Sequence, residues 1–170
     1  TAYEMTTSDW SSVCSSDLAR PEAETIIIGS RMPDSLKKWG VQQGLTMLGF
    51  VEDLTPHYER CRLSIAPLRY GAGVKGKVNQ ALSFGLPVVG SPAAVEGMGL
   101  VHGENVMSAA TPRAFADAIL AVYDDAELWQ SLSDNGRASL EGRFTSQVAT
   151  SALREALTAS LGDWDREAGG

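Results

Sequence analysis

The residues best suited to chemistry lie in one glycine-rich stretch, Gly71-Ala-Gly-Val-Lys-Gly-Lys77. Gly71 and Gly73 permit backbone conformations and close approaches that a Cβ would prevent, so their amides can face a phosphate. Apolar runs on either side predict a strand before the stretch, then a helix and a second strand after it. A helix that begins near Val74 would direct its unpaired N–H groups and its positive dipole end at the same point. The pattern therefore predicts an anion-binding turn.

Lys75 and Lys77 place two cations in the first turn of this helix. Cations are unfavourable at a helix N-terminus on dipole grounds, so two of them favour an anionic ligand. The alternative is a solvated first turn with two unrelated lysines. Arg69 precedes the turn and could reach a phosphate, or it could pair with a surface carboxylate.

The surrounding sequence alternates strand and helix signals. Short β-branched runs such as Thr25-Ile-Ile-Ile-Gly29 are typical of strands buried in a parallel sheet. Strands are predicted at 25–29, 45–50, 63–67, 87–90 and, more weakly, 105–108; helices are predicted at 56–62, 75–84, 126–142 and 145–161, with one more starting at Thr111-Pro112. Thr55-Pro56 and Thr111-Pro112 supply the helix-start signals. The order predicts an α/β fold, a doubly wound parallel sheet with helices on both faces.

Ligands of such sheets bind beyond the carboxyl ends of the strands. Gly29, Gly49 to Val51, Gly71 to Lys77 and Ser91 to Glu96 all follow predicted strands. We therefore expect these four segments to converge on one edge of the sheet.

The composition argues against several classes of protein. The chain has 170 residues, enough for one full core, and a formal net charge of −7, which argues against nucleic-acid binding. Its longest apolar runs are strand-sized, which predicts no transmembrane segment, and without a secretory signal the expected location is cytoplasmic. Cys14 and Cys61 match no metal or disulfide spacing, and Cys61 is expected to be a buried free thiol.

The chain divides into three expected regions. Residues 1–22 are rich in Ser, Thr and Asp and are expected to be a disordered or non-native leader, since Ser8 to Leu18 resembles translated sequencing-adapter sequence. Residues 23–161 are expected to form the α/β domain, and residues 162–170 a frayed tail.

From about Glu24 to Val148 the chain resembles the C-terminal, donor-binding half of B-type glycosyltransferases, in particular the retaining family 4. The resemblance rests on Gly49-Phe-Val-Glu-Asp-Leu54, Ala66 to Lys77, Ala81-Leu-Ser-Phe-Gly-Leu-Pro-Val-Val89 and Ala94-Val-Glu-Gly97, in that order. It implies a Rossmann-like domain that binds a nucleoside-diphosphate sugar as co-substrate, with no cofactor and no metal.

The resemblance also implies roles for single residues. The loop Gly49-Phe50-Val51 would hold the nucleotide base, and the turn Gly71-Ala72-Gly73 would lie against the sugar and the diphosphate. Lys75, helped by Lys77, would neutralise the diphosphate as it leaves with increasing negative charge. Glu96 would hydrogen-bond the sugar hydroxyls, or it is simply a loop carboxylate in water.

Two positions depart from the family pattern. Ala72 and Gln80 stand where the family commonly has two glutamates, one near the sugar and one that grips the ribose. Gln80 can still hydrogen-bond a ribose, but without charge. The change is either a subfamily trait or a loss of catalysis.

The family's acceptor-binding half is absent, so the chain is expected to be a fragment that is inactive alone. The expected function is transfer of a hexosyl group to a glycan or lipid-linked acceptor. The alternatives are a non-catalytic nucleotide-binding or assembly module, and a nucleotide-sugar 2-epimerase-like isomerase, which would need a Ser-Gly-Gly turn.

Other residues are interpreted structurally. His57 and His102 are expected to be surface histidines because neither has a metal ligand at suitable spacing. Trp129 and Phe144 are expected to be core residues.

Overall fold

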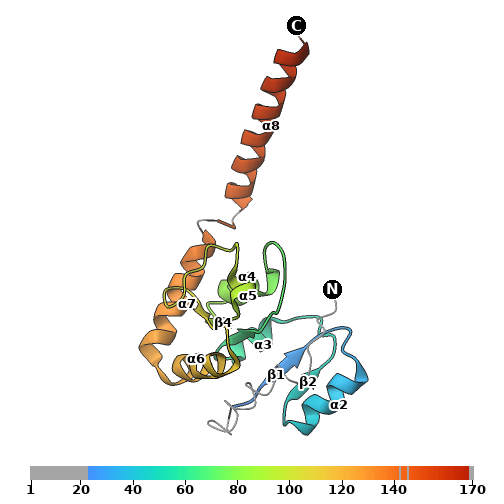
Figure 1. Cartoon of the computed structure of the whole chain (residues 1–170), viewed down its shortest axis with the longest axis vertical. Coiled ribbons are helices and arrows are strands. Elements are labelled where there is room, and N and C mark those ends of the chain that lie inside the picture. Colours follow the sequence, from blue (N-terminus) through green and yellow to red (C-terminus); the bar gives the residue numbers. More distant parts are fainter. Residues whose placement is uncertain (1–22, 142, 145, 169–170) are drawn as a thin grey trace.

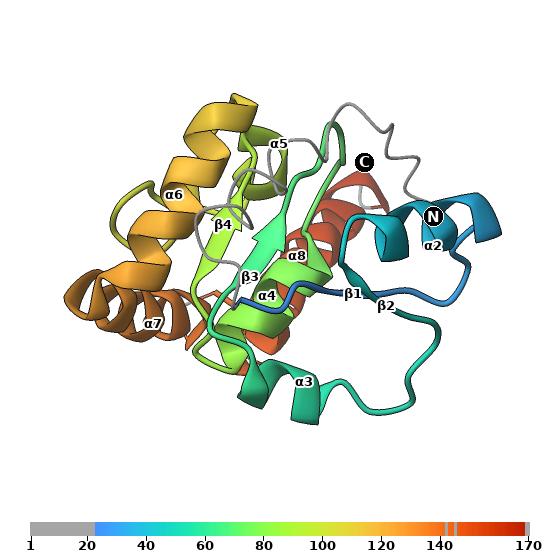
Figure 2. The same ribbon diagram turned by 90° about the horizontal axis from the view of Figure 1, so that it is seen from below.

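The computed structural model describes residues 23–168 except 142 and 145, and it shows strands covered by helices, with α8 extending away from these layers (Figures 1 and 2). The predictions for residues 1–22 lie outside the described residues. The elements are β1 (Ile26–Ile28), α2 (Asp34–Gln42), β2 (Thr46–Leu48), α3 (Thr55–Arg60), β3 (Ser64–Ala66), α4 (Gly76–Ser83), β4 (Val88–Gly90), α5 (Pro92–Val95), β5 (Met107–Ser108), α6 (Pro112–Asp124), α7 (Ala126–Glu141) and α8 (Ser146–Ala168).

The strands are parallel, as the sequence predicts, and each lies inside its predicted range. β1 pairs with β2 in the register Ile26 to Thr46. β3, β4 and β5 form a second sheet in that order, with Val89 opposite both Ile65 and Met107. The predicted fold class, a doubly wound arrangement with helices on both faces, is confirmed, although the described strands form two sheets.

Glu24 connects the two sheets at the amino end of β1. One oxygen of its carboxylate accepts a hydrogen bond of 2.8 Å from Thr46 Oγ1 on β2, and the other pairs with the Arg60 guanidinium at the end of α3. The side chain thus links β2 to the helix that leads into β3. Both partners are exposed, so the pair orients these elements more than it stabilises them.

The core lies on both faces of β4. Val88 and Val89 are fully buried and, as neighbours on a strand, point to opposite faces. Val88 packs with Val78, Ala81 and Leu82 of α4, whereas Val89 packs with the apolar face of α6 and with Leu132 of α7. β4 is therefore the central strand around which both helical layers are assembled.

α7 packs against α4 through a glycine. A Cβ at Gly136 would lie 2.8 Å from Leu82 Cδ2, so only glycine permits this close approach of the two helices. Nearby, Ser133 Oγ donates a hydrogen bond of 2.6 Å to the carbonyl of Gly85, the residue that ends α4 with a φ of +69°. These contacts fix α4, the helix that follows the glycine-rich turn.

Some local predictions need correction. α2 and α5 were not predicted, because α2 has a mainly polar sequence and α5 is one short turn. Thr55 is not the N-cap of α3; Leu54 occupies that position and Asp53 Oδ1 accepts from the Thr55 amide at 2.9 Å. Thr111 is the N-cap of α6, as predicted, and accepts from the Ala114 amide.

Three further outcomes concern the C-terminal part. Phe144 is 42% exposed, so its assignment to the core is wrong. Trp129 does pack against the core, and its Nε1 donates to the Arg62 carbonyl at 2.6 Å. α8 continues to Ala168, past the point where the sequence predicts fraying. Within residues 23–168, leaving out 142 and 145, no helix combines the length and the apolar character needed to cross a membrane.

Leu132→Ala tests the core. Leu132 is fully buried against the β4–α6 layer, so its truncation should lower the free energy of unfolding by about 2–5 kcal/mol. Urea unfolding measures the change. Leu153→Ala is the matched control, because Leu153 is 61% exposed and should change stability by less than about 0.5 kcal/mol. Equal losses in the two variants would contradict this assignment of the core.

Candidate functional site

The loops after β3 and β4 are joined at the carboxyl edge of their sheet. The Ser91 amide donates to the Ala66 carbonyl at 3.0 Å, and Ser91 Oγ donates to the Leu68 carbonyl at 2.5 Å. Ser91 is partly buried. One serine therefore holds the first residues of the β3–α4 loop in place before the glycine-rich turn begins.

The glycine-rich turn has the backbone that its sequence predicts at Gly73, whose φ is +69°. Gly71 has no such requirement, since a Cβ at this position would lie 3.6 Å from Lys75 Cε, an ordinary van der Waals contact. The aliphatic stem of Lys75 thus lies over Gly71. The two glycines therefore differ in position, one in the turn and one beside the lysine.

Lys75 lies just before α4, at its N-cap, because the helix begins at Gly76 and not near Val74. Its carbonyl accepts from the amides of Val78 (2.9 Å) and Asn79 (3.2 Å), and its side chain makes no capping hydrogen bond. The prediction of two lysines in the first turn is therefore wrong for Lys75, and Lys77 alone lies there. Lys75 is thus the residue directly before the amino end of α4.

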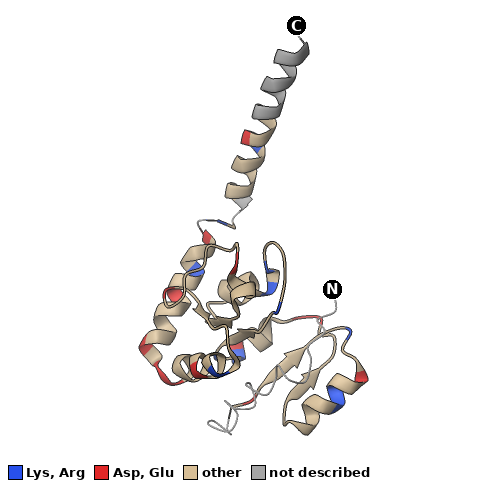
Figure 3. Cartoon of the chain, viewed as in Figure 1, with Lys and Arg blue, Asp and Glu red and all other residues tan. Residues whose placement is uncertain are grey.

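The Lys75 ammonium points toward the loop after α5. Nζ donates a hydrogen bond of 3.0 Å to the Glu96 carbonyl. Gly71, Lys75 and Glu96 therefore meet at one place, where the β3–α4 and α5 loops face each other. Figure 3 shows basic residues at the loop that leads into α4, whereas acidic residues are frequent on α6 and α7.

The remaining predicted residues near this turn lie at the surface. Arg69, Ala72, Lys77 and Gln80 are exposed, as is the side chain of Glu96, while Lys75 is half-buried. Exposure leaves these side chains accessible to a ligand.

The predicted base-binding loop, Gly49-Phe50-Val51, follows β2 in the other sheet. The Gly29 amide lies 3.3 Å from the carbonyls of both Leu48 and Gly49, which brings these two strand ends together. Phe50 is 74% exposed. The four segments expected at one edge are thus joined by hydrogen bonds in two pairs. Gly29 bonds the loop that begins at Gly49, and the segment of residues 71–77 bonds the segment of residues 91–96.

Asp53 has a role that the sequence interpretation missed. The hydrogen bond from the Thr55 backbone amide, assisted by the Thr55 hydroxyl and by the charge of His57, lowers the pKa of Asp53 below its usual 3.8. Asp53 lies at the entry to α3, shortly after the Gly49 loop. The sequence did contain a signal for this role, because aspartate is frequent just before the first turn of a helix.

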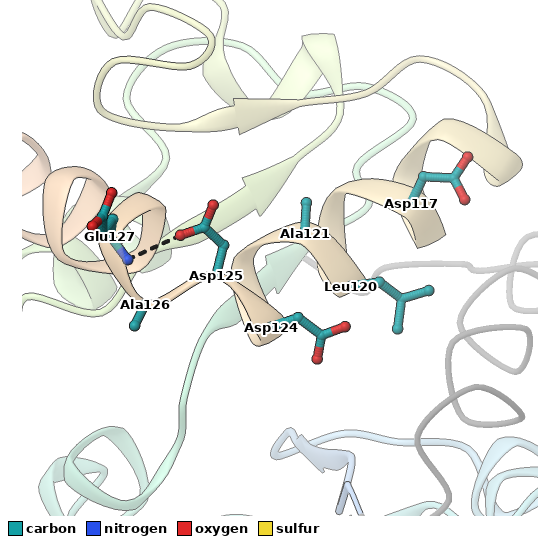
Figure 4. Close-up of a pocket in the computed structure, with 7 residues that line it drawn as sticks. All are labelled: Asp117, Leu120, Ala121, Asp124, Asp125, Ala126 and Glu127. Atoms are coloured by element: carbon teal, nitrogen blue, oxygen red, sulfur yellow. Dashed lines mark hydrogen bonds between the residues drawn. The ribbon is translucent and has the colours of Figure 1, made fainter.

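A hollow of about 670 Å³ lies elsewhere, at the corner between α6 and α7 (Figure 4). Its polar lining is acidic, from Asp117, Asp124, Asp125 and Glu127. Asp125 is already engaged, because its Oδ1 accepts from the amides of Glu127 and Leu128 at the start of α7. Like charges repel, so this hollow is unsuited to a phosphate.

His102 is exposed, but its Nδ1 accepts from the Ser108 amide at 2.9 Å and so has a structural role. Burial raises the pKa of the half-buried Cys61 thiol. Among the residues that the structure describes, no three His, Cys, Asp or Glu side chains are grouped as a metal site would require.

Comparison with known proteins identifies the class. The family model "Glycosyl transferases group 1" matches residues 3–125, and the chain therefore belongs to this glycosyltransferase family. A comparison with curated protein sequences found no significant match.

Solved structures show the same fold. The chain is similar to the C-terminal domain of a glycosyl transferase group 1 protein (LpcC) from Francisella tularensis, with 15% identity, a TM-score of 0.68, and coverage of 84% of this chain and 83% of that one. It is also similar to HepE of Anabaena in complex with UDP, with 20% identity, a TM-score of 0.71, and coverage of 88% of this chain and 44% of that one. A third similar structure is the pneumococcal O-GlcNAc transferase GtfA in complex with UDP and GlcNAc, with 18% identity, a TM-score of 0.70, and coverage of 88% of this chain and 32% of that one. The fold is thus that of the Rossmann-like C-terminal domain of B-type glycosyltransferases.

Coverage differs between these relatives. The chain spans most of the isolated Francisella domain but only 44% of HepE and 32% of GtfA. The comparison thus identifies a domain shared by these proteins.

Ser91→Ala tests the clamp on the β3–α4 loop. Loss of the hydroxyl leaves the Leu68 carbonyl without this donor and should cost about 1 kcal/mol of unfolding free energy. Amide hydrogen exchange should accelerate in residues 68–71. Ser83→Ala is the control, because Ser83 Oγ bonds only the Gln80 carbonyl within its own helix at an exposed position. Unchanged exchange in the loop would contradict the clamp.

Asp53→Ala tests the α3 cap through its pH dependence. Because the pKa of Asp53 is lowered by folding, its stabilisation is complete above 3.8 and is lost as the pH falls through the lowered value. The variant should be less stable than the wild type near neutral pH, and the difference should disappear in acid. Thermal unfolding across the pH range measures this, with Glu59→Ala on the same helix as the control. A difference that persists in strong acid would exclude the charged cap as its cause.

Proposed function

We propose that this chain is the donor-binding domain of a retaining glycosyltransferase that transfers a hexosyl group from a nucleoside-diphosphate sugar to a glycan or lipid-linked acceptor. The observation that carries the proposal is the placement of Lys75: it stands at the N-cap of α4, its stem lies beside Gly71, and its Nζ reaches the Glu96 carbonyl. Membership of the glycosyltransferase family supports it. The UDP in the HepE and GtfA structures makes a nucleoside diphosphate a reasonable ligand.

The chemistry that this arrangement suits is stabilisation of a leaving group. As the bond from the anomeric carbon to the diphosphate breaks, negative charge grows on the phosphate oxygens and the sugar becomes oxocarbenium-like. The first amides of α4 and the Lys75 ammonium would already be oriented toward that charge. The domain would bring no cofactor to this step, and the sugar nucleotide is the co-substrate.

Lys75 would change partner when a donor binds. In the structure its ammonium donates to a neutral carbonyl, that of Glu96. A phosphate oxygen is a stronger acceptor because the hydrogen bond is then assisted by charge on both sides. A small movement of a flexible lysine would be enough to make this exchange, and it would leave the Glu96 carboxylate beside the sugar.

The other proposed contacts are inferred from where each residue lies in the fold. Gly49, Phe50 and Val51 would receive the base, Arg69 and Lys77 would add positive charge near the diphosphate, and Gln80 would hydrogen-bond the ribose. Turnover would also require an acceptor-binding partner or domain. Relatives such as HepE, of which this chain spans 44%, have room for one in their remaining length.

A second candidate is a non-catalytic nucleotide-binding or assembly module. Ala72 and Gln80 favour it, because both are exposed near the turn and neither carries the charge expected at these positions from the family resemblance. The two candidates share the diphosphate site and differ in turnover. Sugar transfer or hydrolysis by the complete protein would decide for the transferase.

Lys75→Ala tests the diphosphate site. Calorimetric titration of the 170-residue chain with UDP, GDP and ADP should identify one that binds, and the variant should bind it about ten- to a hundredfold more weakly, the value of one charge-assisted hydrogen bond. Lys38→Ala, an exposed lysine on α2, is the control and should leave the affinity unchanged. Unchanged affinity in Lys75→Ala would refute the phosphate role, and no binding by the folded wild type would refute the donor site.

A further inference from the structure

Tyr70 is an aromatic residue at the site that none of the roles above uses. Its side chain is 69% exposed, and only Phe50, at 74%, is more exposed among the aromatic residues whose side chains are described. Other aromatic rings have packing roles: Tyr58 stacks on Phe84 with centroids 5.0 Å apart, and Tyr123 and Trp129 lie under the Arg62 guanidinium. Tyr70 therefore contributes little to the core.

The position of Tyr70 is fixed on both sides. On its amino side, Ser91 holds the Leu68 carbonyl. On its carboxyl side, Gly71 lies against the stem of Lys75, whose ammonium reaches Glu96. The aromatic ring is thus attached to the backbone between the clamped start of the loop and the point where the Lys75 ammonium reaches Glu96.

The chemical character of this loop is mixed. Lys75 suits a phosphate, but Tyr70 and the 55% exposed Val74 offer apolar surface on either side of the turn. A diphosphate gains nothing from an aromatic ring. A hexose does, because its ring has faces of C–H groups that can cover an aromatic ring while its hydroxyls point outward to polar groups such as the Glu96 carboxylate.

We propose that Tyr70 stacks against the hexose ring of the donor and so helps to select the sugar-bearing nucleotide over the free nucleoside diphosphate. The inference rests on the proposed donor-binding function and adds a sugar-contacting residue to it. Lys75 and Tyr70 then contact different parts of the donor: the lysine binds the diphosphate, and the tyrosine binds the sugar.

The test compares each nucleoside diphosphate with its sugar derivative. The 170-residue chain, Tyr70→Ala and Tyr70→Phe are titrated with UDP, GDP and ADP and with UDP-glucose, UDP-GlcNAc, GDP-mannose and ADP-glucose. For the pair that binds, Tyr70→Ala should bind the sugar nucleotide about three- to tenfold more weakly, the range of one aromatic contact, and bind the diphosphate as the wild type does. Tyr70→Phe keeps the ring and should restore the wild-type ratio.

Phe144→Ala, which truncates an exposed aromatic on the connection between α7 and α8, is the matched control. Unchanged affinities in Tyr70→Ala, or equal losses for diphosphate and sugar nucleotide, would overturn the sugar contact while leaving the donor site intact. Failure of the wild type to bind any member of the panel would instead refute the proposed function, and the Tyr70 inference with it.

Discussion

The hydrogen bond from Lys75 Nζ to the Glu96 carbonyl is the contact on which the site depends. It joins the loop after β3 to the loop after α5, while Ser91 joins the loop after β3 to the connection between β4 and α5. Both contacts start from a sheet whose central strand, β4, is buried on both faces. The loops on either side of Lys75 are therefore anchored to a buried sheet, and in the proposed function this anchoring would position the charge before a donor binds.

The distribution of charge reinforces this arrangement. The chain carries a net charge of −7, and acidic residues line the hollow between α6 and α7. An anionic ligand is repelled from that corner and attracted to the cations around the glycine-rich turn (Figure 3). The charge of the residues that line a hollow therefore says more about the ligand of this protein than the volume of the hollow does.

The sequence predicted those features that depend on neighbouring residues. Runs such as Ile26 to Ile28 and Val88 to Gly90 gave the strands, and Gly73 gave the turn. The predicted helix after the turn differs from α4 by one residue at each end, because Lys75 and Phe84 are its caps. α2 was missed although Leu36, Trp39 and Gly40 have helical spacing, because no side-chain cap marks its start at Pro33, and Tyr70 was missed because exposure is a property of the folded chain.

The replacement of two expected glutamates by Ala72 and Gln80 fits a division between binding and chemistry. In the proposed site the diphosphate would interact with backbone amides and with Lys75, and neither contact would require a carboxylate at position 72 or 80. Those carboxylates would act on the sugar and the ribose, where hydrogen bonds from Glu96 and Gln80 can take over part of the role, at lower strength for the neutral amide. The site can therefore retain nucleotide affinity whether or not it retains turnover. Nucleotide binding alone therefore does not separate an enzyme from a binding module in this fold, because both candidates share the diphosphate site and differ only in turnover.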